Sequence, residues 1–211
     1  WRRQIFMESS TVHGGSFSAK IMTRKEWTFN IPGVLTNALP SVGFAGLPPT
    51  ITAISLRGGT PISAKPTTVS AWVQYYPGSG GIDSGSLTVQ VLGQVAGKDS
   101  VIGTGIVIIP PTSSWMQVTA TVNYLPVHAN VPVDTFRIAL SSGKAQAGLD
   151  SSTLYADDLS MTTIPNPDNS SVPGVLANDV VKVYPNPAAG SIYIDVLKGT
   201  DMTFKLINVS G

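Results

Sequence analysis

Apolar and polar residues alternate in short stretches separated by turn residues, and this pattern limits how the chain can fold more than any other feature. It is clearest at residues 67–78, TTVSAWVQYYPG. Two sets alternate there: Val69, Ala71, Val73 and Tyr75, and Ser70, Trp72, Gln74 and Tyr76. A period of two belongs to β-strands, whose successive side chains point to opposite faces of a sheet. The pattern therefore predicts a strand with the first set buried and the second set facing outward.

Further stretches of this kind, together with short apolar runs, predict eight strands, at residues 17–22, 51–56, 69–76, 86–91, 101–109, 115–124, 136–140 and 154–161. Charged residues make up only 12% of the chain, while 21 glycines and 16 prolines supply turns. Many short strands joined by turns are typical of a β-sandwich, so the sequence predicts an all-β fold. Residues 27–50 show little period, and we expect a long surface loop there.

In an eight-stranded jelly roll, alternate strands belong to different sheets. Strands one, eight, three and six would then share a sheet, which places outward-facing aromatic and amide side chains of two strands together. These are Trp72, Gln74, Tyr76, Trp115, Gln117 and Asn123. Aromatic rings stack on sugar rings and amides bind hydroxyls, so this face is a candidate glycan-binding surface. Arg137 belongs to strand seven and would reach this face only around an edge.

The last predicted strand, LYADDLSM at 154–161, contains two adjacent carboxylates. With Leu159 and Met161 taken as facing the core, a period of two also turns Tyr155 and Asp157 inward. An inward carboxylate needs a bound cation, a basic partner or several hydrogen-bond donors. His13 has no second ligand residue at metal-binding spacing beside it, and we interpret it as a turn residue.

This strand resembles the last strand of jelly-roll carbohydrate-binding modules. In several such families the first aspartate binds a structural calcium, and the resemblance implies this role for Asp157. Oxygen ligands from the chain entering the first strand often complete that site, which implies Glu8 as a second ligand. No cofactor other than this structural calcium is expected.

Charge and cysteine content exclude several classes of partner. The net charge is +1, and the 13 basic and 12 acidic residues form no runs, so neither nucleic acid nor an anionic membrane surface is an expected partner. The absence of cysteine excludes disulfides and thiolate metal sites. No apolar stretch is long enough to span a bilayer. Because the chain begins at Trp1 without a methionine, we expect a fragment or a mature form.

Composition changes after the predicted sandwich. Residues 164–178 are rich in Pro, Asn and Ser and are predicted to form a linker. Beyond it, VYPNPAAGSIYIDV and a later stretch ending Asn-x-x-Gly resemble the opening of the type A C-terminal sorting domain of the Bacteroidetes type IX secretion system. That domain is a small Ig-like β-sandwich with several more strands, so residues 179–211 would form its beginning. The resemblance implies contact with the type IX machinery and a location outside the cell or on the outer-membrane surface.

The predicted first domain, residues 1–163, carries a second resemblance over roughly residues 10–163. The segments IPGVLTNA, GGTPISAKPTTVSAWVQYYPG, SSWMQVTATVNYL, VDTFRIALSSG and LYADDLSM resemble a family of domains named for carbohydrate metabolism in secreted Bacteroidetes proteins. The family is similar to carbohydrate-binding modules, and membership implies a jelly roll with a glycan-related role.

An enzyme is the main competing class. Cleavage of a glycosidic bond normally uses two carboxylates, yet Glu8 and Glu26 are the only glutamates and most aspartates lie in predicted turns. Neither histidine lies near a glycine-flanked serine, so no Ser-His-Asp motif stands out. We therefore predict a non-catalytic carbohydrate-binding or adhesion module, and no enzyme. The alternatives are a structural spacer or cargo domain without ligand, whose outward tryptophans are covered by loops, and an accessory domain of a glycoside hydrolase or lyase.

Overall fold

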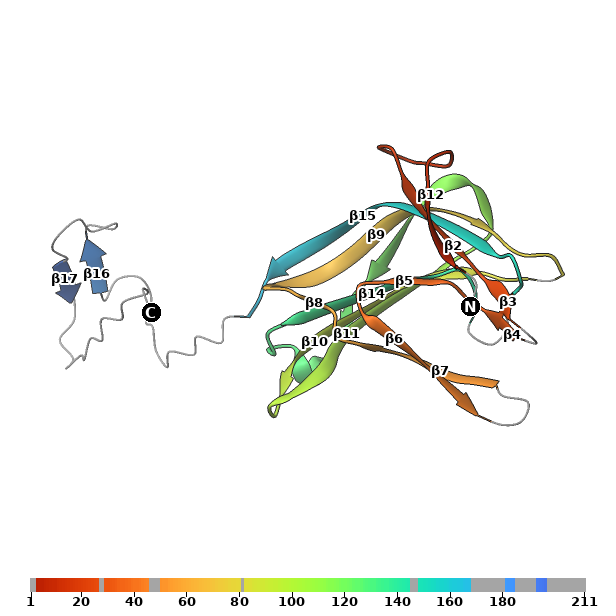
Figure 1. Ribbon diagram of the computed structural model, residues 1–211. Helices are drawn as coiled ribbons and strands as arrows, with labels where there is room; N and C mark the ends of the chain where they lie inside the picture. The colour runs from red at the N-terminus through yellow and green to blue at the C-terminus, as the bar shows by residue number, and fades with distance from the viewer. Residues whose placement is uncertain are drawn as a thin grey trace. The chain divides into compact units, whose positions relative to one another are not determined.

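The chain is almost entirely β-structure, as predicted (Figure 1). The computed structural model describes residues 3–26, 29–45, 50–80, 82–144, 148–167, 181–184 and 193–196. The chain divides into two compact units, Trp1–Pro167 and Asp168–Gly211. Within the described ranges the helical content is a single 3-10 turn, Pro126–His128, and no helix there has the length and hydrophobicity to cross a bilayer.

The strands of the first unit are, in chain order, β1 (Ile5–Glu8), β2 (Ser18–Met22), β3 (Arg24–Glu26), β4 (Phe29–Ile31), β5 (Val34–Thr36), β6 (Leu39–Ala45), β7 (Thr50–Arg57), β8 (Thr60–Pro61), β9 (Ala64–Tyr76), β10 (Gly85–Val95), β11 (Lys98–Ile109), β12 (Thr112–Thr121), β13 (Asn123–Tyr124), β14 (Thr135–Ser141) and β15 (Thr153–Pro165). The second unit contains β16 (Val181–Tyr184) and β17 (Tyr193–Val196).

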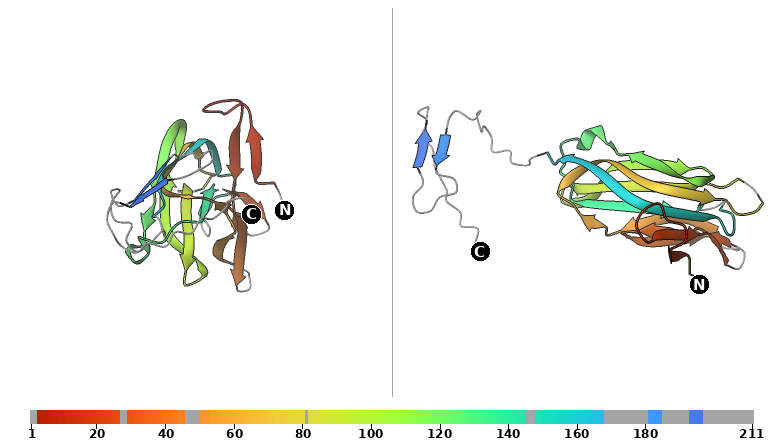
Figure 2. Two further views of the ribbon diagram at one scale, coloured as in Figure 1. Left: turned by 90° about the vertical axis from the view of Figure 1, so that its left-hand side faces the viewer. Right: turned by 90° about the horizontal axis from the view of Figure 1, so that it is seen from above.

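Two antiparallel sheets pack face to face to form the sandwich (Figures 1 and 2). The first sheet has the order β1-β2-β15-β9-β12, and the second has the order β13-β11-β10-β14-β5, with β8 also paired to β14. The run β2-β15-β9-β12 joins predicted strands one, eight, three and six in the expected order. The alternating distribution of strands that defines a jelly roll is therefore confirmed for the first sheet.

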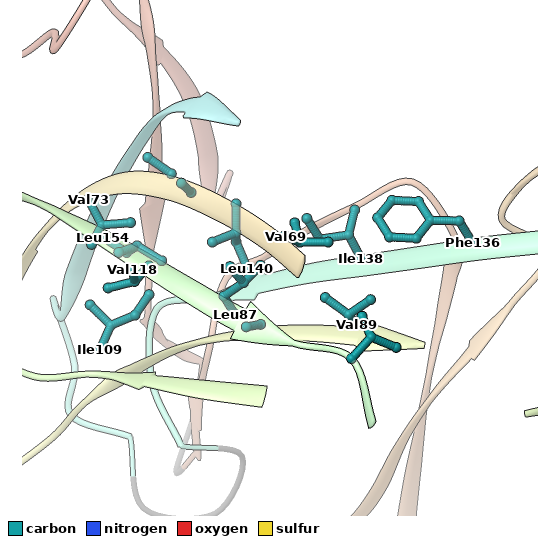
Figure 3. Packing of buried hydrophobic residues seen from close by; sticks show 14 of the residues in the cluster. Val69, Val73, Leu87, Val89, Ile109, Val118, Phe136, Ile138, Leu140 and Leu154 are labelled. Atoms are coloured by element: carbon teal, nitrogen blue, oxygen red, sulfur yellow. The ribbon is translucent and has the colours of Figure 1, made fainter. Parts of the chain in front are cut away.

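The core lies between the sheets and is built from the predicted apolar sets (Figure 3). Val69, Val73 and Tyr75 of β9 are at most 1% exposed, and Leu87 and Val89 of β10 are fully buried. Phe136, Ile138 and Leu140 of β14 complete the opposite wall. Full burial of side chains of this size contributes roughly 1.5–3 kcal/mol each, so these three strands carry much of the stability of the fold.

The predicted strand at 51–56 exists as β7 but does not enter the second sheet. It pairs with β6, and the two form a hairpin that projects beyond the sandwich (Figure 1). In the second sheet β14 pairs with β5 and β8 instead. β5 lies inside the predicted loop and β8 between two predicted strands, and both are too short to show a clear alternation. The predicted loop over 27–50 accordingly contains β4, β5 and β6.

The inner and outer faces of β15 differ from the prediction because the strand contains a bulge. Its register against β9 shifts between Asp157 and Ser160, and Asp158 has φ 45°. One extra residue in a strand reverses the faces of the residues on either side. Before the bulge Leu154 and Ala156 are buried, so Tyr155 and Asp157, which alternate with them, face outward. After it Met161 lies opposite the inward-facing Val69, although Leu159 is 53% and Met161 42% exposed. The prediction that Tyr155 and Asp157 face inward is therefore wrong.

The end of the first unit lies slightly beyond its predicted boundary. β15 continues to Pro165, and the amide of Asn166 exchanges two hydrogen bonds with the backbone of Val133, at 2.9 and 3.0 Å. Residues 164–166 of the predicted linker are thus part of the sandwich, and 168–178 lie outside the described residues.

In the second unit, β16 and β17 form an antiparallel pair in which Tyr184 lies opposite Tyr193. The later strand ending Asn-x-x-Gly, like residues 185–192, lies outside the described residues.

Candidate functional site

The bulge in β15 brings two adjacent carboxylates to the outer face of the first sheet. Asp157 lies directly opposite Trp72 of β9, and directly opposed residues on neighbouring strands share a face. Asp158 follows in the left-handed backbone region, which aspartate tolerates better than most residues with a side chain. The outward Trp72 and both carboxylates therefore meet at one point of the surface.

Asp157 holds the β1–β2 loop against this point. Its Oδ2 accepts hydrogen bonds from the backbone N–H groups of His13 at 2.8 Å and Gly14 at 3.2 Å, and its Oδ1 accepts one from Asp158 N–H at 2.8 Å. Partial burial acts to raise the pKa of Asp157, but these donors outweigh it and hold the pKa below its usual value. A side chain on Gly14 would place Cβ 2.8 Å from Asp158 Oδ2, so a larger residue there would have to displace the Asp158 carboxylate.

The side chain of His13 joins three strands of the sheet through aromatic and polar contacts. Its Nδ1 lies 2.7 Å from Asp158 Oδ2. Its ring stacks on Trp72, with centroids 4.0 Å apart and planes at 13°, and meets Trp115 edge-on at 5.7 Å. We call His13, Trp72, Trp115, Asp157 and Asp158 the His13 cluster.

The cluster shows that one face of Trp72 is occupied by the loop. Coverage of an outward tryptophan by a loop is the structural alternative that the sequence left open for this residue. His13 does lie in a turn segment, as predicted, but its ring has a packing role that sequence analysis missed. Its partners lie on β9, β12 and β15, far along the chain, so no local pattern could have revealed that role.

Four of the other predicted residues lie on the same outer face. Gln117 is exposed and directly opposite Trp72. Gln74 is only 8% exposed, and its Oε1 lies 3.1 Å from the Tyr76 hydroxyl. Tyr76 is 41% exposed. Trp115 is partly exposed at the rim of the His13 cluster.

A second aromatic group, which sequence analysis did not predict, surrounds Tyr76. Its ring meets that of Tyr155 edge-on, with centroids 6.0 Å apart and planes at 90°. The Lys20 ammonium lies 5.5 Å from the centre of the Tyr155 ring. We call Tyr76, Tyr155 and Lys20 the tyrosine platform. The corrected face of β15 would have placed Tyr155 here, because Tyr155 is the register partner of Gln74.

Asn123 and Arg137 do not lie on this face. After Thr121 the chain leaves the first sheet, and Asn123 pairs with Thr104 of β11 in the second sheet. The crossing falls inside the predicted strand 115–124, whose alternation continues through it, so the pattern alone placed Asn123 on the wrong sheet. Arg137 lies on β14, opposite Gln90, as its strand number implied.

The outer face of the second sheet contains a shallow groove that includes Asn123. Thr88, Val89, Gln90, Thr104, Gly105, Ile106 and Asn123 line a volume of about 310 Å³. This is at the lower end of the size range of small-molecule sites. The groove and the His13 cluster belong to different sheets.

The surroundings of Asp157 and Glu8 do not fit a shared calcium site. Calcium requires several oxygen ligands, whereas the Asp157 oxygens face N–H groups. Glu8 Oε1 accepts hydrogen bonds from the Ser10 hydroxyl and the N–H groups of Ser9 and Ser10, and Ser10 lowers the pKa of Glu8. In the described part of the chain, no three His, Asp or Glu side chains cluster as metal ligands.

Asp83 is the most deeply buried carboxylate among the described residues, at 0% exposure. Its oxygens accept hydrogen bonds from the N–H groups of Ser84, Lys144 and Leu149, and from the Ser152 hydroxyl. Burial acts to raise the pKa of Asp83, but these donors hold it below its usual value. Asp83 has no access to a ligand and acts as a structural anchor for the chain around Lys144 and Leu149.

Comparison with known proteins gives a match in fold. No family model matches the chain, and no curated protein matches it. A solved structure described as a "putative glycoside hydrolase" from Bacteroides thetaiotaomicron is similar to it, with a TM-score of 0.56 at 12% sequence identity. The similarity covers 76% of this chain and 57% of that chain, so this chain spans little more than half the length of its structural neighbour.

Proposed function

We propose that the first unit is a non-catalytic carbohydrate-binding module of a secreted or cell-surface bacterial protein. The observation that carries this proposal is the tyrosine platform, where an exposed Tyr76 ring meets Tyr155 edge-on beside the Lys20 ammonium. The solved structure with a similar fold, described as a "putative glycoside hydrolase", supports carbohydrate as the ligand class.

The chemistry of this face matches that of a sugar ring. A pyranose has an apolar face of C–H groups and a rim of hydroxyls, so it pairs with an aromatic ring flanked by polar groups. Tyr76 and Trp115 supply the rings, and Gln117 and Lys20 supply the polar groups. Trp72 supports this surface indirectly, because one face of its indole is occupied by His13.

A glycan-array screen of the 211-residue chain, followed by titration of the best ligand, tests the proposal. Tyr76→Ala should lower affinity roughly 5- to 150-fold, which corresponds to about 1–3 kcal/mol for a lost aromatic contact. Thr119→Ala is the matched control, because Thr119 is exposed on the same sheet and its hydroxyl contacts only Ser70 among the described residues. Equal affinity of Tyr76→Ala and wild type would exclude this surface, and the absence of any glycan ligand would favour a structural spacer.

We also propose that residues 179–211 begin a type IX sorting domain. The β16–β17 pair supports this, since it flanks the Tyr-Pro-Asn-Pro segment at 184–187 as the opening strands of such a domain would. Fusing a complete sorting domain that carries this opening to a foreign cargo should export the cargo from a type IX-competent host. Retention of that fusion in the periplasm would count against the proposal.

A further inference from the structure

A row of polar side chains crosses the outer face of the second sheet. Cross-strand register places Asn123 beside Thr104, Thr104 beside Gln90, and Gln90 beside Arg137. The row crosses four neighbouring strands, a span of about 14 Å at the usual spacing between strands. Its first three members line the groove described above. Arg137, at the end of the row, is not part of that lining but lies directly opposite Gln90, which is.

An apolar side chain lies next to the polar row. Ile106, two residues along β11 from Thr104, lines the groove and is 64% exposed, and Ile108, two residues farther along the strand and outside the groove lining, is 56% exposed. Opposite Ile106 lies Thr88, which also lines the groove. The groove therefore offers an apolar surface on one side and hydrogen-bonding groups on the other, which is the arrangement that a sugar ring requires.

Contacts within the protein hold the side chain of Arg137, the one charged residue of the polar row, in place. Arg137 Nε donates a hydrogen bond to the Gly58 carbonyl at 2.6 Å. One terminal nitrogen lies 3.5 Å from Gln90 Oε1, a contact that directs the Gln90 amide N–H₂ group away from Arg137. In the part of the chain that the structure describes, no carboxylate lies within salt-bridge distance of Arg137. The guanidinium is thus fixed in position with its charge unpaired.

We propose that this groove is a second glycan-binding site, specific for a carboxylated oligosaccharide, with Arg137 binding the carboxylate of a uronic acid residue. An arginine guanidinium matches a carboxylate in geometry and forms stronger hydrogen bonds with it than with a neutral hydroxyl. Gln90, Thr104 and Asn123 bind hydroxyls of the neighbouring sugars, and Ile106 contacts an apolar ring face. The site rests on the proposed function for the ligand class, but it uses other residues on the other sheet.

Calorimetric titration of the 211-residue chain with trigalacturonate tests the site. The matched ligand is the same trisaccharide after carboxyl reduction, which replaces each carboxylate by a neutral hydroxymethyl group. Wild type should bind the reduced sugar at least about tenfold more weakly than trigalacturonate, as expected for a lost charge-assisted hydrogen bond. Trigalacturonate binding should also weaken as salt is raised.

Three variants distinguish recognition of the carboxylate by Arg137 from a general effect of positive charge on binding. Arg137→Gln should lower trigalacturonate affinity at least about tenfold and leave affinity for the reduced sugar unchanged. Lys98→Gln removes one positive charge at the exposed β10–β11 turn and should leave both affinities unchanged. Asn123→Ala should weaken binding of both sugars, because Asn123 contacts hydroxyls that both possess.

Arg137 also holds the Gly58 carbonyl, so urea unfolding should first establish that Arg137→Gln is folded. If it is not, Arg137→Lys and Asn123→Ala carry the test, with a partial loss expected for each. Equal affinity of wild type for the two sugars, or equal losses in Lys98→Gln and Arg137→Gln, would overturn the proposal. Tyr76→Ala alters the tyrosine platform alone and should leave trigalacturonate affinity unchanged while it lowers affinity for the glycan found on the array, so failure of one site is distinguishable from failure of the other.

Discussion

The imidazole of His13 lies flat against the indole of Trp72, with ring centroids 4.0 Å apart and ring planes at 13°. This contact joins the β1–β2 loop to the middle of β9, while Asp157 and Asp158 bind the same loop from β15. Two strands therefore hold one loop through independent contacts. The loop takes up one face of the tryptophan, so in this structure Trp72 contributes mainly to packing.

His13→Ala should lower the free energy of unfolding by about 0.5–1.5 kcal/mol, the usual contribution of an aromatic pair beyond its buried area. Urea denaturation measures this change. His13→Phe is the matched control, since it keeps a ring on Trp72 and loses only the contact with Asp158. A loss as large in His13→Phe as in His13→Ala would assign the stability to the Asp158 contact and contradict a packing role.

The stabilisation provided by Asp157 should depend on pH. Because folding lowers the pKa of Asp157 from 3.8, its contribution is fully present above about pH 3.8 and is lost as pH falls through the lowered value. Asp157→Asn should therefore be less stable than wild type at pH 7, and the difference should shrink below about pH 3.8. Urea midpoints of both proteins over this range give the measurement, and a difference independent of pH would be incompatible with the N–H donors seen here.

Asp83→Asn should be among the most destabilising substitutions in the chain, at about 3 kcal/mol. Asparagine replaces one carboxylate oxygen by an N–H₂ group. That group cannot accept the hydrogen bonds that the oxygen accepts now, so buried N–H groups would be left unsatisfied. Asp99→Asn is the control, because Asp99 is exposed at the β10–β11 turn. Similar unfolding midpoints for the two variants would show that the buried hydrogen bonds of Asp83 contribute little.

Chelation should leave the melting temperature unchanged. Both oxygens of Asp157 and Oε1 of Glu8 already accept hydrogen bonds, and Glu8 Oε2 lies 3.7 Å from the Lys20 ammonium, so removal of calcium should cost no stability. The measurement is thermal unfolding before and after exhaustive treatment with EDTA, with added calcium as the reverse test. A lower melting temperature that calcium restores would establish the metal site that the family resemblance implied, since a ligand that binds only the folded state raises its stability.

Much of the first sheet could be predicted because apolar residues at every second position of a strand form the face that is buried. Val69, Val73 and Tyr75 were assigned to the core from alternation alone, and the assignment is correct because β9 contains no bulge at these positions. The order of strands in this sheet followed from the jelly-roll rule. Gln74, Gln117 and Tyr76 were placed on the outer face for the same reasons.

The site could be predicted only in part, because the alternation of apolar and polar residues does not show where a strand bulges or where the chain changes sheet. A bulge at Asp158 turned Tyr155 and Asp157 outward, and a crossing after Thr121 moved Asn123 to the other sheet. Each is a change of a single residue in register or in strand partner, yet each changes the face or the sheet of every side chain that follows.

Sequence alone determined that this chain forms a β-sandwich and which side chains of β9, β10 and β14 fill it, because local alternation reflects the need to bury one face of each strand. Tertiary structure decided that His13 meets Trp72, that Asp157 binds a loop, and that Arg137 contacts Gln90 and Gly58. These contacts join residues far apart in the chain, and their geometry depends on how strands pair and bulge. No local pattern contains that information, because cross-strand contacts are selected by the packing of the whole sandwich.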